Sequence, residues 1–265
     1  MGGKKILLHA EQGLGDTLQF IRYAPLVGDK GADVVLQVQP ELRRLLSEIK
    51  GIRLRECSEV AAEEIVCQCA LPSLPSVFGT QLHTIPSSAG YLARPAETVE
   101  QWSARLPQAG LKVGLAWAGN PRHGRDRHRS LSLVLLEPVL RISGVTFVSL
   151  QKGPAASQIL QLPAGVKVLQ VEDESGDLGD TADLIASLDL VISVDTVIAH
   201  LAGALGKKVW VLLPFVPDWR WLLRRSDSPW YSSARLFRQP SPGDWGQPIR
   251  QAATELQKVA GQAQR

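Results

Sequence analysis

The sequence predicts an α/β fold with mostly parallel sheets. Two short apolar runs, Leu190–Val194 and Val209–Leu213, have the length and unbroken hydrophobicity of strands buried on both faces of a parallel sheet. Between them, Asp195 and Thr196 are residue types that cap helix N-termini, and Gly206 ends the intervening helix where a left-handed residue is favoured. A strand, a capped helix and a second strand, in this order, are typical of an α/β protein.

The same alternation extends along the chain. Further strands are expected over residues 4–9, 33–38, 52–54, 65–67, 111–117, 145–150 and 166–171. Helices are expected from near residue 17 to Pro25, which should interrupt the first one, and over residues 40–50, 133–140, 181–188, 197–205 and 249–259. The stretch over residues 71–95 is rich in Pro, Ser and Gly and is expected to be mostly irregular.

Length and composition limit the class of protein. A chain of 265 residues can bury a sizeable core, as one large domain or two small ones. A net charge of +3 is too small to imply a nucleic acid or an acidic membrane as partner. The three cysteines are odd in number and include no C-x-x-C pair, so we expect reduced, mostly buried thiols in a cytoplasmic protein. No apolar run approaches the roughly 18 residues of a membrane-spanning helix.

A glycine-containing loop follows the first expected strand. Gly13 and Gly15 resemble the start of a dinucleotide fingerprint, but Leu18 stands where the third glycine belongs, and the chain contains no Gly-Lys-Ser/Thr sequence of a P-loop. Asp16 follows this loop at the expected start of a helix. It is either a structural helix cap or a carboxylate at a cleft edge that can accept a proton.

A strongly basic loop follows the strand expected over residues 111–117. The segment NPRHGRDRHRS, residues 120–130, contains four arginines, among them Arg127 and Arg129. It can be a solvated loop, a nucleic-acid patch or a clamp for phosphate oxygens, for which Arg is the preferred bidentate donor. We favour the clamp, because this loop and Asp195 both follow the carboxyl ends of strands, where α/β sheets bind ligands.

The residues around the central helix allow a structural and a functional interpretation. Asp195 and Thr196 can be simple caps, and His200 can be a packed, hydrogen-bonded core residue. Thr196 and His200 are four positions apart and share a helix face. Their combination at the end of a buried strand favours a site for an anion or a polyol.

Two further groups of residues bear on the ligand. The acidic residues after the strand expected over residues 166–171 fail the spacing of a calcium loop, and the chain has no Asp-x-Asp pair, so no required divalent metal is predicted; these residues are Glu172, Asp173, Glu174, Asp177 and Asp180. Aromatic residues follow Pro214 and suit either the faces of a sugar or packing between domains: Phe215, Trp219, Trp221, Trp230 and Tyr231.

Four motifs together resemble a known family. HAEQGLGDTLQF, VGLAWAGNPRHGRDRHRS, DLVISVDTVIAHLAGALGKKVWVLLPF and DWRW are similar to the heptosyltransferase-like glycosyltransferases of family 9. The resemblance is closest to the branch found at the C-terminus of bacterial tetratricopeptide-repeat proteins, which implies such repeats in a longer parent chain. It implies a GT-B architecture, in which two Rossmann-like domains face each other across a cleft. The expected parts are an acceptor-side domain over residues 1–105, a nucleotide-sugar-binding domain over residues 106–245, and a C-terminal helix over residues 246–265 that packs back on the first domain.

The resemblance also implies an activity and site residues. It implies inverting, metal-independent sugar transfer from a nucleotide-diphosphate donor to a glycan or protein hydroxyl, without a cofactor. Asp16 matches the catalytic base, beside an acceptor-side loop of Gln12, Gly13 and Gly15. The positions that match donor or phosphate binding are Gly119, Asn120, Arg127, Arg129, Asp195, Thr196 and His200.

The chain departs from this pattern at two places. Val197 replaces a glycine that follows Asp-Thr in heptosyltransferases, and the acidic ribose-binding residue is missing after residues 151–153. These departures favour an alternative, a non-catalytic nucleotide- or sugar-binding or protein-interaction module on the same fold. A third candidate is a sugar-nucleotide epimerase.

Overall fold

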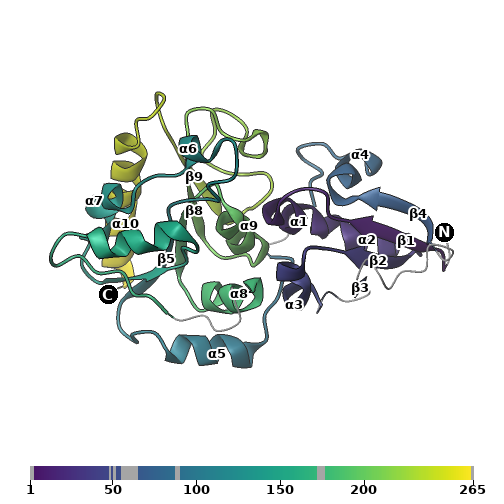
Figure 1. The fold of residues 1–265 in the computed structure, drawn as a ribbon, viewed down its shortest axis with the longest axis horizontal. Coiled ribbons are helices and arrows are strands. Elements are labelled where there is room, and N and C mark those ends of the chain that lie inside the picture. The colour runs from purple at the N-terminus through teal and green to yellow at the C-terminus, as the bar shows by residue number, and fades with distance from the viewer. Residues whose placement is uncertain are drawn as a thin grey trace.

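Two parallel sheets organise the molecule (Figure 1). The computed structural model describes residues 3–47, 49, 52–54, 65–86, 90–171 and 177–263. The first sheet has the order β3-β2-β1-β4, with β1 Lys5–His9, β2 Asp33–Gln37, β3 Ile52–Leu54 and β4 Ile65–Ala70. The second has the order β6-β5-β7-β8-β9, with β5 Leu111–Ala116, β6 Val145–Ser149, β7 Leu190–Val194, β8 Val209–Leu213 and β9 Ala234–Arg238.

Helices connect these strands, and the longest of those described, α10 (Gly246–Ala263), follows the last strand. In the first half they are α1 Leu14–Phe20, α2 Ala24–Asp29, α3 Arg43–Leu46, α4 Leu74–Val77 and α5 Ala96–Ala104. In the second half they are α6 Asp126–Arg129, α7 Glu137–Leu140, α8 Leu178–Ala186, α9 Val197–Ala204 and α10 Gly246–Ala263. None of the helices in the described residues combines the length and the apolar character needed to span a bilayer.

The strand order reverses once in each sheet. In the first sheet the order reverses between β1 and β4, and in the second between β5 and β7. Loops at such a reversal diverge to opposite faces and leave a crevice at the carboxyl ends of the strands. Because β5 and β7 pair in parallel, with Ala116 opposite Ser193, the basic loop and Asp195 lie at the same sheet edge, as the sequence predicted.

The buried strands of the second sheet agree closely with the sequence. Every residue of β7 and β8 is buried, as their unbroken apolar runs predicted, and Gly206 takes a positive φ of 72° after α9. Thr196 is the N-cap of α9, and its hydroxyl accepts the N–H of Ile198 at 3.3 Å. Local sequence therefore determines this strand–helix–strand unit.

The other elements had mixed outcomes: two expectations are wrong, and one strand was missed. The expected break near Pro25 is present: α1 ends at Phe20, a 3-10 turn spans Ile21–Tyr23, and Pro25 lies in the first turn of α2, where a missing N–H costs nothing. Residues 166–171 form no strand and make one isolated bridge, between Leu169 and Val148. Strand β9 was not expected, because an edge strand needs no continuous apolar run and this one exposes Arg235. Cys67 is exposed rather than buried, on edge strand β4.

The C-terminal helix packs on the second sheet. Helix α10 contacts α7, β8 and β9, and Figure 1 shows it on the side away from the first sheet. Its residues Ile249, Ala252 and Leu256 are buried in the core of the second half. The expectation that this helix packs back on the first domain is therefore wrong. Cys57, Gly51 and the acidic residues 172–174 lie outside the described residues.

Candidate functional site

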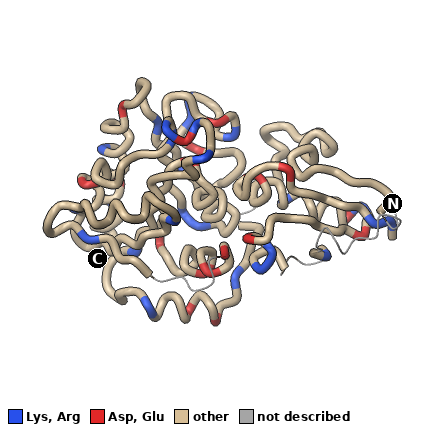
Figure 2. The backbone as a smooth tube through the Cα atoms, viewed as in Figure 1, with Lys and Arg blue, Asp and Glu red and all other residues tan. Residues whose placement is uncertain are grey.

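A cavity of about 420 Å³ opens at the carboxyl edge of the second sheet. Its walls come from the loops after β5, β7, β8 and β9, and thus from the crevice at the reversal of strand order. Figure 2 shows lysine and arginine positions gathered around the α6 turn beside this edge. The lining includes Arg125, Arg127, Arg129, Asp195, Phe215, Asp218, Gln239 and Trp245.

The basic loop is built so that its arginines reach the cavity. Arg129 donates from Nε to Asp126 Oδ1 at 3.2 Å, which orients its guanidinium within the one-turn helix α6. A Cβ on Gly119 would lie 2.4 Å from Asp126 Oδ1 and 2.7 Å from Arg129 Nη2, so a larger residue there would have to displace this ion pair. Asn120 is exposed and accepts the N–H of Arg122 at 3.0 Å; it shapes the turn and does not line the cavity.

The three residues predicted around α9 have different positions. Asp195 lines the cavity and is almost fully buried, and burial raises the pKa of its carboxyl group. Thr196 serves as the helix cap, with its hydroxyl 3.1 Å from Ser193 Oγ, and does not line the cavity.

His200 is buried and neutral. It does not line the cavity, but it lies next to Asp195, which does. Its Nδ1 lies 2.9 Å from the Tyr231 hydroxyl, and its Nε2 lies 3.7 Å from Asp195 Oδ1. Burial, with a smaller contribution from the charge of Arg220, lowers the pKa of His200 to about 3. His200 therefore contributes a fixed, uncharged ring rather than a proton switch at neutral pH.

The glycine loop of the first sheet faces this site from the other half of the molecule. Helix α1 packs on α9, and Gly15 lies against the His200 ring, where a Cβ would come within 2.7 Å of Cδ2. Gly13 is the N-cap of α1, and its N–H donates to Asp16 Oδ2 at 2.9 Å. Gln12 is held by its carbonyl, which accepts from Gln39 Nε2 at 2.8 Å.

Arg220 connects Asp16 to the cavity, and the sequence did not single out this role. Its Nη2 forms an ion pair with Asp16 Oδ1, and its Nη1 donates to Asp218 Oδ1 at 2.7 Å. Asp218 lines the cavity, so the guanidinium lies between the carboxylate of the first half and the pocket of the second. The DWRW motif could have indicated this role, because an arginine between two tryptophans favours a packed position over a solvated loop.

The aromatic residues after β8 divide between the two roles that the sequence left open. Trp221, Trp230 and Tyr231 are buried and belong to the core shared by the two halves. Arg22, from the first half, donates to the Trp230 carbonyl at 2.5 Å and lies 4.9 Å from the Tyr231 ring centre. Phe215 is half-exposed and lines the cavity, which is the position that suits a ligand.

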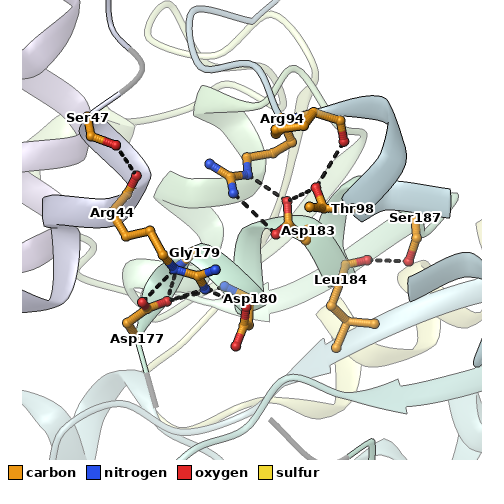
Figure 3. Close-up of polar contacts among 11 residues, drawn as sticks. Arg44, Ser47, Arg94, Thr98, Asp177, Gly179, Asp180, Asp183, Leu184 and Ser187 are labelled. Atoms are coloured by element: carbon orange, nitrogen blue, oxygen red, sulfur yellow. Dashed lines mark hydrogen bonds and ion pairs between the residues drawn. The ribbon is translucent and has the colours of Figure 1, made fainter. Parts of the chain in front are cut away.

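Ion pairs on α8 hold the two halves together (Figure 3). Arg44 of α3 binds Asp177 through Nε at 2.7 Å and also pairs with Asp180. Arg94 binds Asp183 through Nε at 2.6 Å, and both side chains are almost fully buried. These contacts fix α8 of the second half against α3 and against the segment that joins the halves.

The arrangement has the components of an anion site next to a carboxylate. Three arginines and a buried acid line the cavity, and Asp16 approaches from the opposite domain through Arg220. Arginine is suited to diphosphate oxygens, and a carboxylate can accept a proton from a hydroxyl. Among the described residues there is no cluster of three or more His, Cys, Asp or Glu side chains that could hold a metal ion.

Several solved glycosyltransferase structures superpose on this chain. ADP-heptose lps heptosyltransferase II from E. coli superposes with a TM-score of 0.70 at 13% identity, over 98% of this chain and 100% of that one. The chain has a GT-B-like fold. A glycosyl transferase of family 9 from Veillonella parvula superposes with a TM-score of 0.65 at 10% identity, over 99% and 97% of the two chains. The iron-containing dodecameric glycosyltransferase TibC from E. coli has a TM-score of 0.58 at 12% identity, over 99% and 76%.

Sequence comparison finds a longer relative. The protein FlbA from Caulobacter vibrioides is 30% identical over 284 residues, which cover 97% of this chain and 47% of FlbA. The chain therefore spans about half the length of the curated relative that it matches. No protein-family model matches the chain.

Proposed function

We propose that the chain is an inverting, metal-independent glycosyltransferase that moves a sugar from a nucleoside-diphosphate donor to a hydroxyl acceptor. The observation that carries this proposal is the contact of Asp16, in helix α1 of the first half, with Arg220 beside the arginine-lined cavity of the second half. A GT-B-like fold with heptosyltransferases among its structural neighbours supports it.

In the proposed mechanism the cavity binds the donor diphosphate. Arg127 and Arg129 bind phosphate oxygens, and the acceptor hydroxyl oxygen attacks the anomeric carbon from the opposite face. The new C–O bond forms as the bond to the diphosphate breaks, and the hydroxyl proton passes to Asp16. A carboxylate takes this proton only as the bond forms, so most of the rate enhancement comes from alignment and from charge stabilisation of the leaving group.

The proposal includes the identities of the substrates in part. An ADP-sugar is the first donor to test, because heptosyltransferase II is named for ADP-heptose. The acceptor is a hydroxyl of a glycan or a protein, and no nucleic acid takes part. We place the protein in the cytoplasm, and we propose that tetratricopeptide repeats precede this domain in a longer parent chain, as the resemblance of its motifs implies.

Metal independence is part of the proposal and has a direct test. The arginines of the cavity supply the positive charge that a metal ion provides in other transferases. Transfer should continue at an unchanged rate after dialysis against EDTA. A loss of activity that iron or magnesium restores would contradict this part of the proposal, and TibC, an iron-containing neighbour, makes iron the first ion to test.

Replacement of Asp16 tests the proposed base. Asp16→Asn should lower turnover by about 10²–10⁴-fold, the usual contribution of positioned acid–base catalysis. Product formation from ADP-heptose and a panel of glycan acceptors measures the effect. Asp227→Asn, which removes a carboxylate from a solvent-exposed pair with Arg225, is the matched control and should retain full activity. Equal turnover of the two variants would remove Asp16 from the mechanism.

A non-catalytic binding module remains the second candidate. Two observations favour it: Thr196 and His200 do not line the cavity, and Val197 stands at the start of α9 where heptosyltransferases have glycine. Titration calorimetry with ADP, UDP and GDP, combined with an assay for donor hydrolysis, separates the candidates. Tight nucleotide binding without hydrolysis or transfer, across many acceptors, would favour the module.

A further inference from the structure

Each carboxylate oxygen of Asp16 already accepts a hydrogen bond. Oδ2 accepts the N–H of Gly13 at 2.9 Å, which closes the first turn of α1, and Oδ1 is paired with Arg220. Each oxygen keeps a second lone pair, but the Arg220 guanidinium lies against Oδ1 between the carboxylate and the cavity, and so it covers the side from which an acceptor hydroxyl would approach. The Gly13 contact is local to α1, whereas the Arg220 contact joins the two halves of the molecule and can be broken without unfolding either half.

Arg220 is placed to exchange partners. Its side chain is largely buried, and its guanidinium lies 4.7 Å from the Trp219 ring centre and 5.7 Å from that of Phe20. Nη1 is held by Asp218, a residue of the cavity wall, and Nε is buried without a hydrogen-bond partner among the described residues. Arg220 does not itself line the cavity, so its guanidinium has to move past Asp218 to reach a ligand there. A buried N–H without a partner is costly, which lowers the cost of that movement.

We propose that Arg220 blocks Asp16 until the donor binds, and that the donor diphosphate draws this guanidinium away and frees the carboxylate. This inference rests on the proposed function. A diphosphate carries more negative charge than one carboxylate and offers several acceptor oxygens to the guanidinium. The base therefore becomes available only when a donor is present, and donor binding precedes productive acceptor binding.

The exchange predicts an energetic coupling between Asp16 and Arg220 in nucleotide binding. If Asp16 competes with phosphate for Arg220, then Asp16→Asn should tighten ADP binding about ten-fold, the size expected for one charge-assisted hydrogen bond. Arg220→Gln should weaken ADP binding by a similar factor. In the Arg220→Gln background, Asp16→Asn should change the ADP affinity by less than about two-fold, because the contested group is gone.

Titration calorimetry of the four proteins with ADP measures this double-mutant cycle. Adenosine is the matched ligand, because it lacks the phosphates and should bind all four proteins equally. Asp227→Asn is the matched variant, because it breaks an Arg–Asp pair on the surface and should leave ADP affinity unchanged. Thermal unfolding verifies that each variant is folded, and Arg220→Lys, which keeps the charge but loses the fork, replaces Arg220→Gln if the latter does not fold.

The outcomes separate this inference from the proposed function. Tightening by Asp16→Asn that disappears with Arg220→Gln supports the exchange. Equal tightening in both backgrounds would mean that Asp16 only repels the phosphates, and it would overturn the exchange while leaving the donor site intact. Failure of the unaltered protein to bind ADP, UDP or GDP would remove the donor site, and with it both proposals.

Discussion

Gly15 occupies a position where two domains meet with no room for a side chain. A Cβ there would lie 2.7 Å from the His200 ring, and that ring is fixed by Tyr231. Gly15→Ala should therefore cost about 1–3 kcal/mol, as overpacking of a tight core does. Urea denaturation measures the loss. Gly28→Ala is the matched control: Gly28 lies in α2 with nothing within 4 Å of the added methyl, so its replacement should be neutral or stabilising.

His200 predicts how stability depends on pH. Its pKa in the folded protein is about 3, below the value near 6.5 of an unfolded chain. Below pH 6.5 the unfolded state therefore binds a proton that the folded state does not, and stability falls as the pH falls from 6.5 toward 3. His200→Gln should reduce this decline by at most about 1.4 kcal/mol per pH unit.

Urea titrations between pH 7 and pH 4.5 measure the decline. His83→Gln, a replacement of an exposed histidine, corrects for the loss of one imidazole from the unfolded chain. If the free energy of unfolding depends on pH equally in His200→Gln and in this control, then protonation of His200 does not destabilise the folded protein.

At the scale of elements, α8 joins the two halves through two ion pairs that differ in burial. The pair of Arg94 with Asp183 is almost fully buried, whereas the side chain of Arg44 is about half exposed, at 45%. Asp183→Asn removes the charged partner of a buried arginine and should cost about 3–5 kcal/mol. Arg44→Gln breaks partly solvated pairs to Asp177 and Asp180 and should cost less than about 1 kcal/mol.

Thermal and urea unfolding of both variants measure this contrast. The reverse order of the two losses would mean that the exposed pairs, rather than the buried one, hold α8 in place. Arg44 also lowers the pKa of Asp177 from 3.8 to about 2. The stabilisation that this pair gives the folded state should therefore be lost only as the pH falls from 3.8 toward 2.

At the scale of the whole molecule, a donor site in the second half predicts stabilisation by nucleotide. ADP at about 100 times its dissociation constant should add about 2.7 kcal/mol to the free energy of unfolding, and the thermal midpoint should rise by several degrees. The effect should weaken between 50 and 200 mM salt, because arginine–phosphate attraction at a partly open cavity is screened. Scanning fluorimetry at both salt concentrations, with ADP and with adenosine, measures the rise in the thermal midpoint and its salt dependence. Equal shifts from the two ligands would exclude phosphate as the recognised group.

Prediction from sequence succeeded for elements whose structure depends on residues close together in the chain. The continuous apolar runs of β7 and β8, the cap at Thr196 and the turn at Gly206 all follow from residues within one unit. Prediction failed for β9, whose edge position allows charged residues, and for residues 166–171, whose apolar pattern finds a partner at only one bridge. Strand pairing at an edge depends on segments distant in the chain, which local patterns do not encode.

The candidate site shows the same division. The basic loop and Asp195 could be placed together from sequence, because parallel strands bring their carboxyl ends to one edge. The sequence by itself therefore determined an α/β chain in which the basic loop and Asp195 lie at one sheet edge. Only the tertiary structure decided that Asp16 meets Arg220, 204 positions away, because that contact depends on how α1 of the first half packs on α9 of the second.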